Sequence, residues 1–201
     1  MVRQGIDEFC NVLLRTGCIK FGTFQLSSGA LSPYYVDLRL IPSDPEAFKR
    51  AIGYYAETLE QVIKRSSRLV GIPTAGVPYA AVLAFNFAKP FLYLRKEPKD
   101  HGQRRRIEGI IFPGDKVVLL DDVVTTGKNI LEAVDAIRAE GGVVKDAVVL
   151  LDRQQGGEEQ LMKMGVRLRS YATITRVARV LLKRGTIDDE QYREILLQVT
   201  H

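Results

Sequence analysis

The stretch from Lys116 to Lys128 places the strongest constraint on how this chain folds. Four consecutive apolar residues, Val117 to Leu120, lie between a Pro-Gly-Asp sequence and the paired acids Asp121 and Asp122. A short apolar run with these boundaries is typical of a buried strand in a parallel sheet. The acids then follow the carboxyl end of the strand, which is the edge where open α/β sheets bind ligands. We therefore predict an α/β fold with a ligand site at this edge.

The turn after this strand has the groups needed to hold a phosphate. Thr125 and Thr126 supply hydroxyls, Gly127 permits close approach of the backbone, and a helix is expected to begin directly afterwards. Two carboxylates beside this turn would repel a bare anion, so a ribose 5-phosphate, with hydroxyls for the acids, is the better ligand. The alternative is an ordinary strand followed by a capped helix. A nucleoside-triphosphate P-loop is excluded because Asp122 stands where its first glycine is required.

The sequence Leu-Leu-Asp-Asp-Val-Val-Thr-Thr-Gly-Lys resembles the phosphoribosyl pyrophosphate (PRPP) motif of type I phosphoribosyltransferases. The resemblance implies a type I phosphoribosyltransferase-like α/β fold, with a mostly parallel sheet flanked by helices, and PRPP as a substrate. It implies PRPP contacts from Asp121, Asp122, Val123, Val124, Thr125, Thr126, Gly127, Lys128 and Asn129. The two acids would be catalytic, since they would fix the ribose hydroxyls and stabilise positive charge on the sugar.

The basic segment over residues 95–102 reads Arg-Lys-Glu-Pro-Lys-Asp-His-Gly. A solvated surface loop is one interpretation, because so many charges have no apolar anchor. The segment also resembles the catalytic loop of the orotate phosphoribosyltransferase family. That resemblance implies PRPP contacts from Arg95, Lys96, Lys99 and His101. Lys99 and His101 would be catalytic, and a histidine can donate a proton near neutral pH.

Two further segments resemble the orotate-binding parts of the same family. Residues 21–39 are similar to its small amino-terminal hood, which implies orotate contacts from Tyr35 and Val36. An expected strand ends at Asp152-Arg153, where the arginine would either pair with Asp152 or hold a carboxylate-bearing base. This strand end is most similar to the transferase half of bifunctional animal enzymes that make UMP. It implies that Arg153 and Thr125 contact orotate.

Length and composition are those of one ordinary domain. The 201 residues are expected to form an amino-terminal helix and hood over 1–40, a core over 43–184 and a carboxy-terminal helix over 185–201. There is no apolar run long enough to span a bilayer and no signal-peptide pattern, so we expect a cytoplasmic protein without a membrane partner. Cys10 and Cys18 lack metal-ligand spacing and are expected to be buried, reduced thiols.

The net charge of +5 is compatible with nucleic acid or with a small polyanion as partner. The densest basic run, Arg95 to Arg106, contains acids and lacks the interleaved aromatic residues of a single-strand binding surface. We therefore expect a small phosphorylated ligand and no nucleic acid.

Periodicity and turn residues predict the remaining elements. Helices are expected over 6–16, 43–66 and 79–87, after the PRPP motif as far as Gly141, over 158–164, and from Thr173 and Asp188. Strands are expected over 21–26, 34–40, 69–72, 91–95, 143–151 and 167–172.

Together the resemblances imply transfer of the ribose 5-phosphate of PRPP to orotate, giving orotidine 5′-monophosphate and pyrophosphate. Magnesium would be bound mainly through PRPP, with no dedicated protein ligand, and a homodimer would share its active sites between subunits. A transferase for another base and a non-catalytic PRPP-sensing regulator are the alternatives. Bacterial members often have lysines where this chain has Ser27 and Ala75, and we hypothesise that Arg104 to Arg106 partly compensate.

Overall fold

The computed structural model describes residues 2–25, 29, 31–95 and 106–199. The strands of its main sheet are β3 (Arg68–Gly71), β4 (Phe91–Leu94), β5 (Ile107–Glu108), β6 (Lys116–Leu120), β7 (Val123–Val124), β8 (Val143–Asp152) and β9 (Arg167–Thr173). Their order is β5, β4, β3, β6, β8, with β7 and β9 also paired to β8. Only β4 and β5 pair antiparallel among the described strands of this sheet, so the predicted mostly parallel sheet is confirmed.

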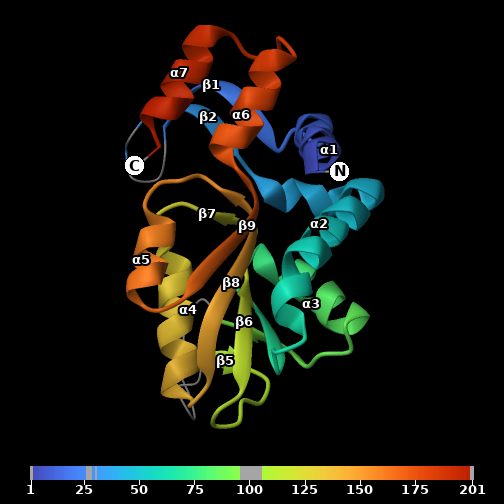
Figure 1. Ribbon diagram of the computed structural model, residues 1–201, viewed down its shortest axis with the longest axis vertical. Coiled ribbons are helices and arrows are strands. Elements are labelled where there is room, and N and C mark those ends of the chain that lie inside the picture. The colour runs from blue at the N-terminus through green and yellow to red at the C-terminus, as the bar shows by residue number, and fades with distance from the viewer. Residues whose placement is uncertain (1, 26–28, 30, 96–105, 200–201) are drawn as a thin grey trace.

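Helices cover both faces of this sheet (Figure 1). The described helices are α1 (Val2–Arg15), α2 (Pro45–Ile63), α3 (Gly76–Asn86), α4 (Lys128–Ala139), α5 (Gly157–Lys163), α6 (Ile174–Lys183) and α7 (Asp189–Leu197). Of these, α2 and α3 pack on one face of the sheet and α4 and α5 on the other. Side chains alternate along β6: Val118 and Leu120 join a core with α1, α2, α3 and α6, whereas Val117 and Leu119 join a core with α4 and α5. The continuous apolar run therefore reflects burial on both faces, as predicted for a parallel strand.

A smaller two-stranded sheet forms the hood, which lies beside α6 and α7 (Figure 1). Its strands β1 (Ile19–Gln25) and β2 (Leu31–Val36) are antiparallel. The predicted extension of the second strand to Leu40 is wrong, because a 3₁₀ helix, η1 (Leu38–Ser43), follows. The Asp37 carboxylate accepts a hydrogen bond from the Arg39 N–H at 3.1 Å and so caps this turn.

Short polar side chains decide where several helices begin. The helix expected from residue 43 begins at Pro45, because Asp44 caps α2 by accepting a hydrogen bond from the Ala47 N–H at 2.9 Å. Thr173 and Asp188 cap α6 and α7, which confirms both predicted starts. Other ends differ from the predictions by a few residues, since α1 begins at Val2 and α2 ends at Ile63.

Two features of the described residues bear on the remaining predictions. Cys10 and Cys18 are both buried and free, as predicted, although Cys18 lies beyond the end of α1. No described helix has the length and apolar composition needed to cross a membrane.

Candidate active site

The paired acids lie where the sequence predicts them, directly after the buried strand β6. Asp121 and Asp122 are only 6% and 7% exposed, yet both line a cavity of about 350 Å³ at the carboxyl edge of the sheet. The cavity is also lined by Val36, Asp37, Arg39, Pro73, Thr74, Ala75, Val123, Thr125 and Asn129. It therefore brings together the hood, the loop after β3 and the turn after β6.

Backbone groups hold the two carboxylates in place. The Asp122 N–H donates to Asp121 Oδ1 at 3.0 Å, and the Val123 N–H donates to Asp122 Oδ1 at 2.8 Å. The Tyr55 hydroxyl donates to the Asp121 carbonyl oxygen. These contacts orient the acids but leave them without a cationic partner among the described residues.

Burial changes the acid–base behaviour of this pair. It raises the pKa of Asp121 well above its usual range, and the neighbouring charge of Asp122 raises it further. Burial also raises the pKa of Asp122 to about 6, although the hydrogen bond from Val123 acts in the opposite direction. A ligand that brings hydroxyl donors or positive charge would stabilise the ionised forms.

The turn from Thr125 to Asn129 wraps around the amino end of α4. Gly127 caps this helix with a φ of +79°, a conformation that glycine adopts without strain. The turn lies against α5, where the Gly157 N–H donates to the Thr125 carbonyl at 3.0 Å. A hollow of about 60 Å³ is lined by Asp121, Val123, Val124, Thr125, Thr126, Gly127, Lys128, Asn129 and Ile130. Backbone N–H groups at a helix amino terminus favour an anion in such a position.

Two arginines lie beside a neighbouring cavity of about 220 Å³, which Asn129 also lines. Arg95 is ion-paired with Glu108 of β5, and Arg106 lies 3.4 Å from Glu132 of α4. Arg106 Nε is buried without a hydrogen-bond partner among the described residues. Both guanidinium groups are therefore near the predicted PRPP site.

Several predicted residues lie outside the described part of the chain. These are Lys96, Lys99 and His101 of the predicted catalytic loop, together with Ser27, Arg104 and Arg105. The roles assigned to them stay predictions.

The hood contributes to the cavity differently from the prediction. Val36 lines the cavity, but Tyr35 is not among the described lining residues and is 38% exposed. Asp37 and Arg39 line it instead, joined by an ion pair of 2.6 Å. Strand periodicity does not predict either residue as part of the cavity, because their contacts depend on the turn into η1.

Arg153 is buried at the end of β8, with 7% exposure. Its backbone N–H donates to the Val124 carbonyl at 3.0 Å, so it lies next to the PRPP motif. The Asp152 carboxylate instead accepts a hydrogen bond from the Gln154 N–H at 2.7 Å, and no ion pair joins it to Arg153 among the described contacts. Arg153 Nη2 is buried and has no hydrogen-bond partner among the described residues. The arginine therefore has a donor available for a ligand.

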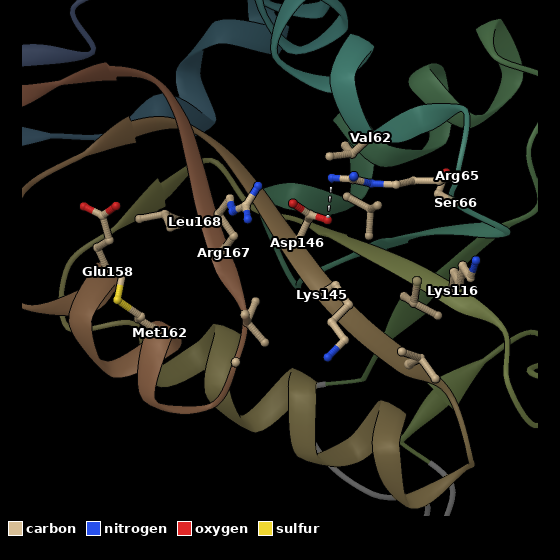
Figure 2. A pocket seen from close by; sticks show the side chains of 15 residues that line it. Val62, Arg65, Ser66, Lys116, Lys145, Asp146, Glu158, Met162, Arg167 and Leu168 are labelled. Carbon is tan, nitrogen blue, oxygen red and sulfur yellow. Dashed lines mark ion pairs between the residues drawn. The ribbon is translucent and has the colours of Figure 1, made fainter.

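A separate cavity of about 580 Å³ lies over the amino-terminal ends of β6, β8 and β9 (Figure 2). Lys116, Lys145 and Arg167 line it, and Arg65 points toward Asp146 with an N–O distance of 3.5 Å. None of the predicted site residues lines this cavity. Because parallel sheets bind ligands at their carboxyl edge, the smaller cavity at Asp121 is the better candidate.

Comparisons with known proteins show the family to which this chain is similar. A family model described as a phosphoribosyl transferase domain matches residues 43–181. The orotate phosphoribosyltransferase of Pyrobaculum islandicum is 42% identical over 183 residues, which cover 91% of this chain and 93% of that protein. The uridine 5′-monophosphate synthase of Caenorhabditis elegans is 39% identical over 92% of this chain, which spans 37% of that enzyme.

Among solved structures, the orotate phosphoribosyltransferase from Aeropyrum pernix is similar with a TM-score of 0.80 and 39% identity, covering 90% of this chain and 99% of that one. The range matched by the family model contains the paired acids, the turn from Thr125 to Asn129 and Arg153. The chain therefore belongs to the phosphoribosyltransferase family and, within it, to the orotate phosphoribosyltransferases.

Proposed function

We propose that the crevice at Asp121 and Asp122 transfers the ribose 5-phosphate of PRPP to orotate, producing orotidine 5′-monophosphate and pyrophosphate for pyrimidine synthesis. One observation carries the proposal: buried acids, a phosphate-sized turn and an arginine with an unpaired donor meet at one sheet edge. The acids suit ribose hydroxyls, the turn suits a phosphate, and the arginine suits the carboxylate of orotate.

PRPP would lie with its 5-phosphate in the turn. Backbone N–H groups of the turn from Thr125 to Asn129 and the hydroxyls of Thr125 and Thr126 would bind that phosphate, with Lys128 adding positive charge. Asp121 and Asp122 would bind the ribose hydroxyls. Their pKa values, raised by burial, would fall when these donors arrive, because hydrogen bonds to a carboxylate favour its charged form.

In the reaction a ring nitrogen of orotate, after losing its proton to solvent, bonds to the anomeric carbon while the bond from that carbon to the pyrophosphate oxygen breaks. Positive charge develops on the sugar, where the two acids would stabilise it electrostatically. Arg95, Lys96, Lys99 and His101 would stabilise the negative charge of the departing pyrophosphate. His101 would also donate a proton to it.

Orotate would be held between the hood and the end of β8. Arg153 would bind its carboxylate, with Thr125, Val36 and Tyr35 completing the contacts. Of these, Val36 and Thr125 line the cavity at Asp121 and Asp122. Arg153 directly follows β8, which pairs with β7 of the PRPP motif. Tyr35 would have to turn toward the cavity to take part.

Magnesium fits the chemistry of this site. The described residues contain no cluster of three or more acidic, histidine or cysteine side chains that could hold a metal, so the oxygen ligands that magnesium prefers would come mainly from PRPP itself. When bound, it would neutralise charge on the pyrophosphate.

A homodimer with shared active sites and a cytoplasmic location are further proposals, which rest on the family resemblance and on the sequence pattern.

The direct test follows the ultraviolet absorbance of orotate after mixing the protein with PRPP and magnesium. We expect absorbance to change only when all components are present. Consumption of a purine in place of orotate would favour the transferase for another base. Binding of PRPP without turnover of any base would favour the regulator.

A further inference from the structure

The guanidinium group of Arg153 is held by Tyr34 of β2. Arg153 Nε donates to the Tyr34 hydroxyl at 3.0 Å, and the guanidinium carbon lies 4.6 Å from the centroid of the same ring. Tyr34 is fully buried, and Arg153 is only 7% exposed. The hydroxyl and the ring face together restrict both the position and the plane of the guanidinium group.

This arrangement leaves a defined part of Arg153 free for a ligand. Since Nε–H is used by Tyr34, an acceptor must bind the terminal nitrogens, and Nη2 is the one that is buried without a partner among the described residues. A buried charged donor without an acceptor is unfavourable. A carboxylate is the acceptor that a guanidinium binds through two parallel hydrogen bonds.

The strand that carries Tyr34 is in turn anchored by the carboxy-terminal segment. Ser32 Oγ lies 2.7 Å from the Tyr34 carbonyl oxygen and 3.0 Å from Gln198 Oε1. Gln198 Nε2 donates to the Leu31 carbonyl at 2.9 Å. Gln198 directly follows α7, which lies beside the hood (Figure 1) and is fixed by the fully buried Ile195.

We propose that Tyr34 is a positioning residue that prepares Arg153 for a carboxylate-bearing base, and that Gln198 holds the strand that presents Tyr34. The proposal rests on the proposed function, and it explains why the site would prefer a base that carries a carboxylate. An unrestrained arginine samples many rotamers. Holding it before the base arrives lowers the entropy lost on binding, so Tyr34 acts on orotate affinity through Arg153.

The first test is Tyr34→Phe, which removes the hydroxyl and keeps the ring. We expect the KM for orotate to rise about tenfold, while kcat and the KM for PRPP change less than about twofold. Tyr192→Phe, at a half-buried tyrosine of α7 outside the site, controls for loss of a hydroxyl and should match the wild type. A KM for orotate that stays at the wild-type value in Tyr34→Phe overturns the proposal.

A double-mutant cycle separates positioning from a general structural effect. In an Arg153→Ala background, Tyr34→Phe should produce no further rise in the KM for orotate, because its effect passes through the arginine. The same fold-increase in both backgrounds would contradict the proposal. Gln198→Ala should raise the KM for orotate about threefold. If Tyr34→Phe does not fold, this variant tests the proposal in its place, and an unchanged KM for orotate overturns it.

The outcomes distinguish this inference from the proposed function. A wild-type protein that consumes no orotate would defeat the proposed function. A wild-type protein that is active, with Tyr34→Phe and Gln198→Ala both keeping its KM for orotate, would defeat only the role of Tyr34.

Discussion

At the scale of single residues, the paired acids illustrate a conflict between folding and ligand binding. Asp121 and Asp122 are almost fully buried and lack a cationic partner among the described residues. Burial of a charge without compensation is unfavourable, which is why their pKa values are raised. The site therefore keeps two groups that destabilise the free protein and that, in the proposed mechanism, would bind the ribose hydroxyls.

The first prediction concerns stability and pH. The pKa of Asp122 rises from an unfolded value of 3.8 to about 6, so the folded state binds more protons between these values. The unfolding free energy must then fall as pH rises through this range. Asp122→Asn removes the penalty and should stabilise the protein by about 2 to 3 kcal/mol at pH 8, but hardly at all near pH 4.

Urea denaturation at both pH values measures this difference. Asp135→Asn, which changes an exposed acid of α4, is the matched control and should show little effect at either pH. A stabilisation by Asp122→Asn that is equal at both pH values would show that burial of charge is not its cause.

The second prediction concerns Lys99 of the predicted catalytic loop. If Lys99 stabilises the departing pyrophosphate, Lys99→Ala removes an interaction made mainly in the transition state. Turnover should then fall about a hundredfold, while the dissociation constant of orotate changes less than about twofold. Equal turnover in the variant and the wild type would reject this role, and Lys163→Ala on α5 serves as a control for loss of a lysine.

At the scale of elements, close packing of α3 against the end of β6 holds the backbone at Asp121 in place. A Cβ added at Gly76 would lie 2.1 Å from the Leu120 carbonyl oxygen and 3.0 Å from Asp121 Cα. No side chain fits in this space unless α3 or the end of β6 moves. The glycine thus lets a helix and a strand meet directly behind the site.

The third prediction follows from this contact. Gly76→Ala should destabilise the protein by about 2 kcal/mol or more and reduce turnover, because the helix must shift away from Asp121. Gly53→Ala is the matched control, since a Cβ there meets no atom within 4 Å in the middle of α2. That change should stabilise the protein by about 0.5 to 1 kcal/mol. A neutral Gly76→Ala would contradict the packing argument.

The fourth prediction concerns the basic segment before β5. Arg106 lines a cavity beside Asn129 and has a buried Nε without a partner among the described residues, which supports a role for positive charge there. Replacing Arg104, Arg105 and Arg106 with alanine should raise the KM for PRPP about tenfold and leave that for orotate unchanged. An unchanged KM for PRPP rejects the compensation hypothesis.

At the scale of the whole molecule, the site is assembled from segments that are far apart in the chain. The hood, the loop after β3 and the PRPP motif line one cavity, and the proposed dimer would add a loop from a second subunit. If so, each active site depends on two chains.

The fifth prediction tests this sharing. Lys99→Ala and Asp122→Asn should each have at most about a hundredth of the wild-type activity as homodimers. Co-expression should restore activity to about a quarter of the wild-type value, because half of the dimers then contain one intact site. Co-expression of Asp121→Asn with Asp122→Asn is the control and should restore nothing. A mixture no more active than its separate variants would show that each loop serves its own subunit.

Local sequence determined much of this protein. The apolar run before Asp121 predicts a strand buried on both faces, and the structure confirms the strand and the position of the acids after it. Helix starts at Thr173 and Asp188 were equally predictable, because a capping side chain lies within three residues of the N–H it binds. A contact between residues so close in the chain can be predicted from the local sequence alone.

Only the tertiary structure decided which distant residues meet. The two-residue strands β5 and β7 show no periodicity and exist because β4 and β8 offer them partners. The contact of Tyr34 with Arg153 likewise depends on how the hood packs against the sheet. Such contacts form only when burial of both faces of the sheet brings separate segments together, and no local pattern specifies that arrangement.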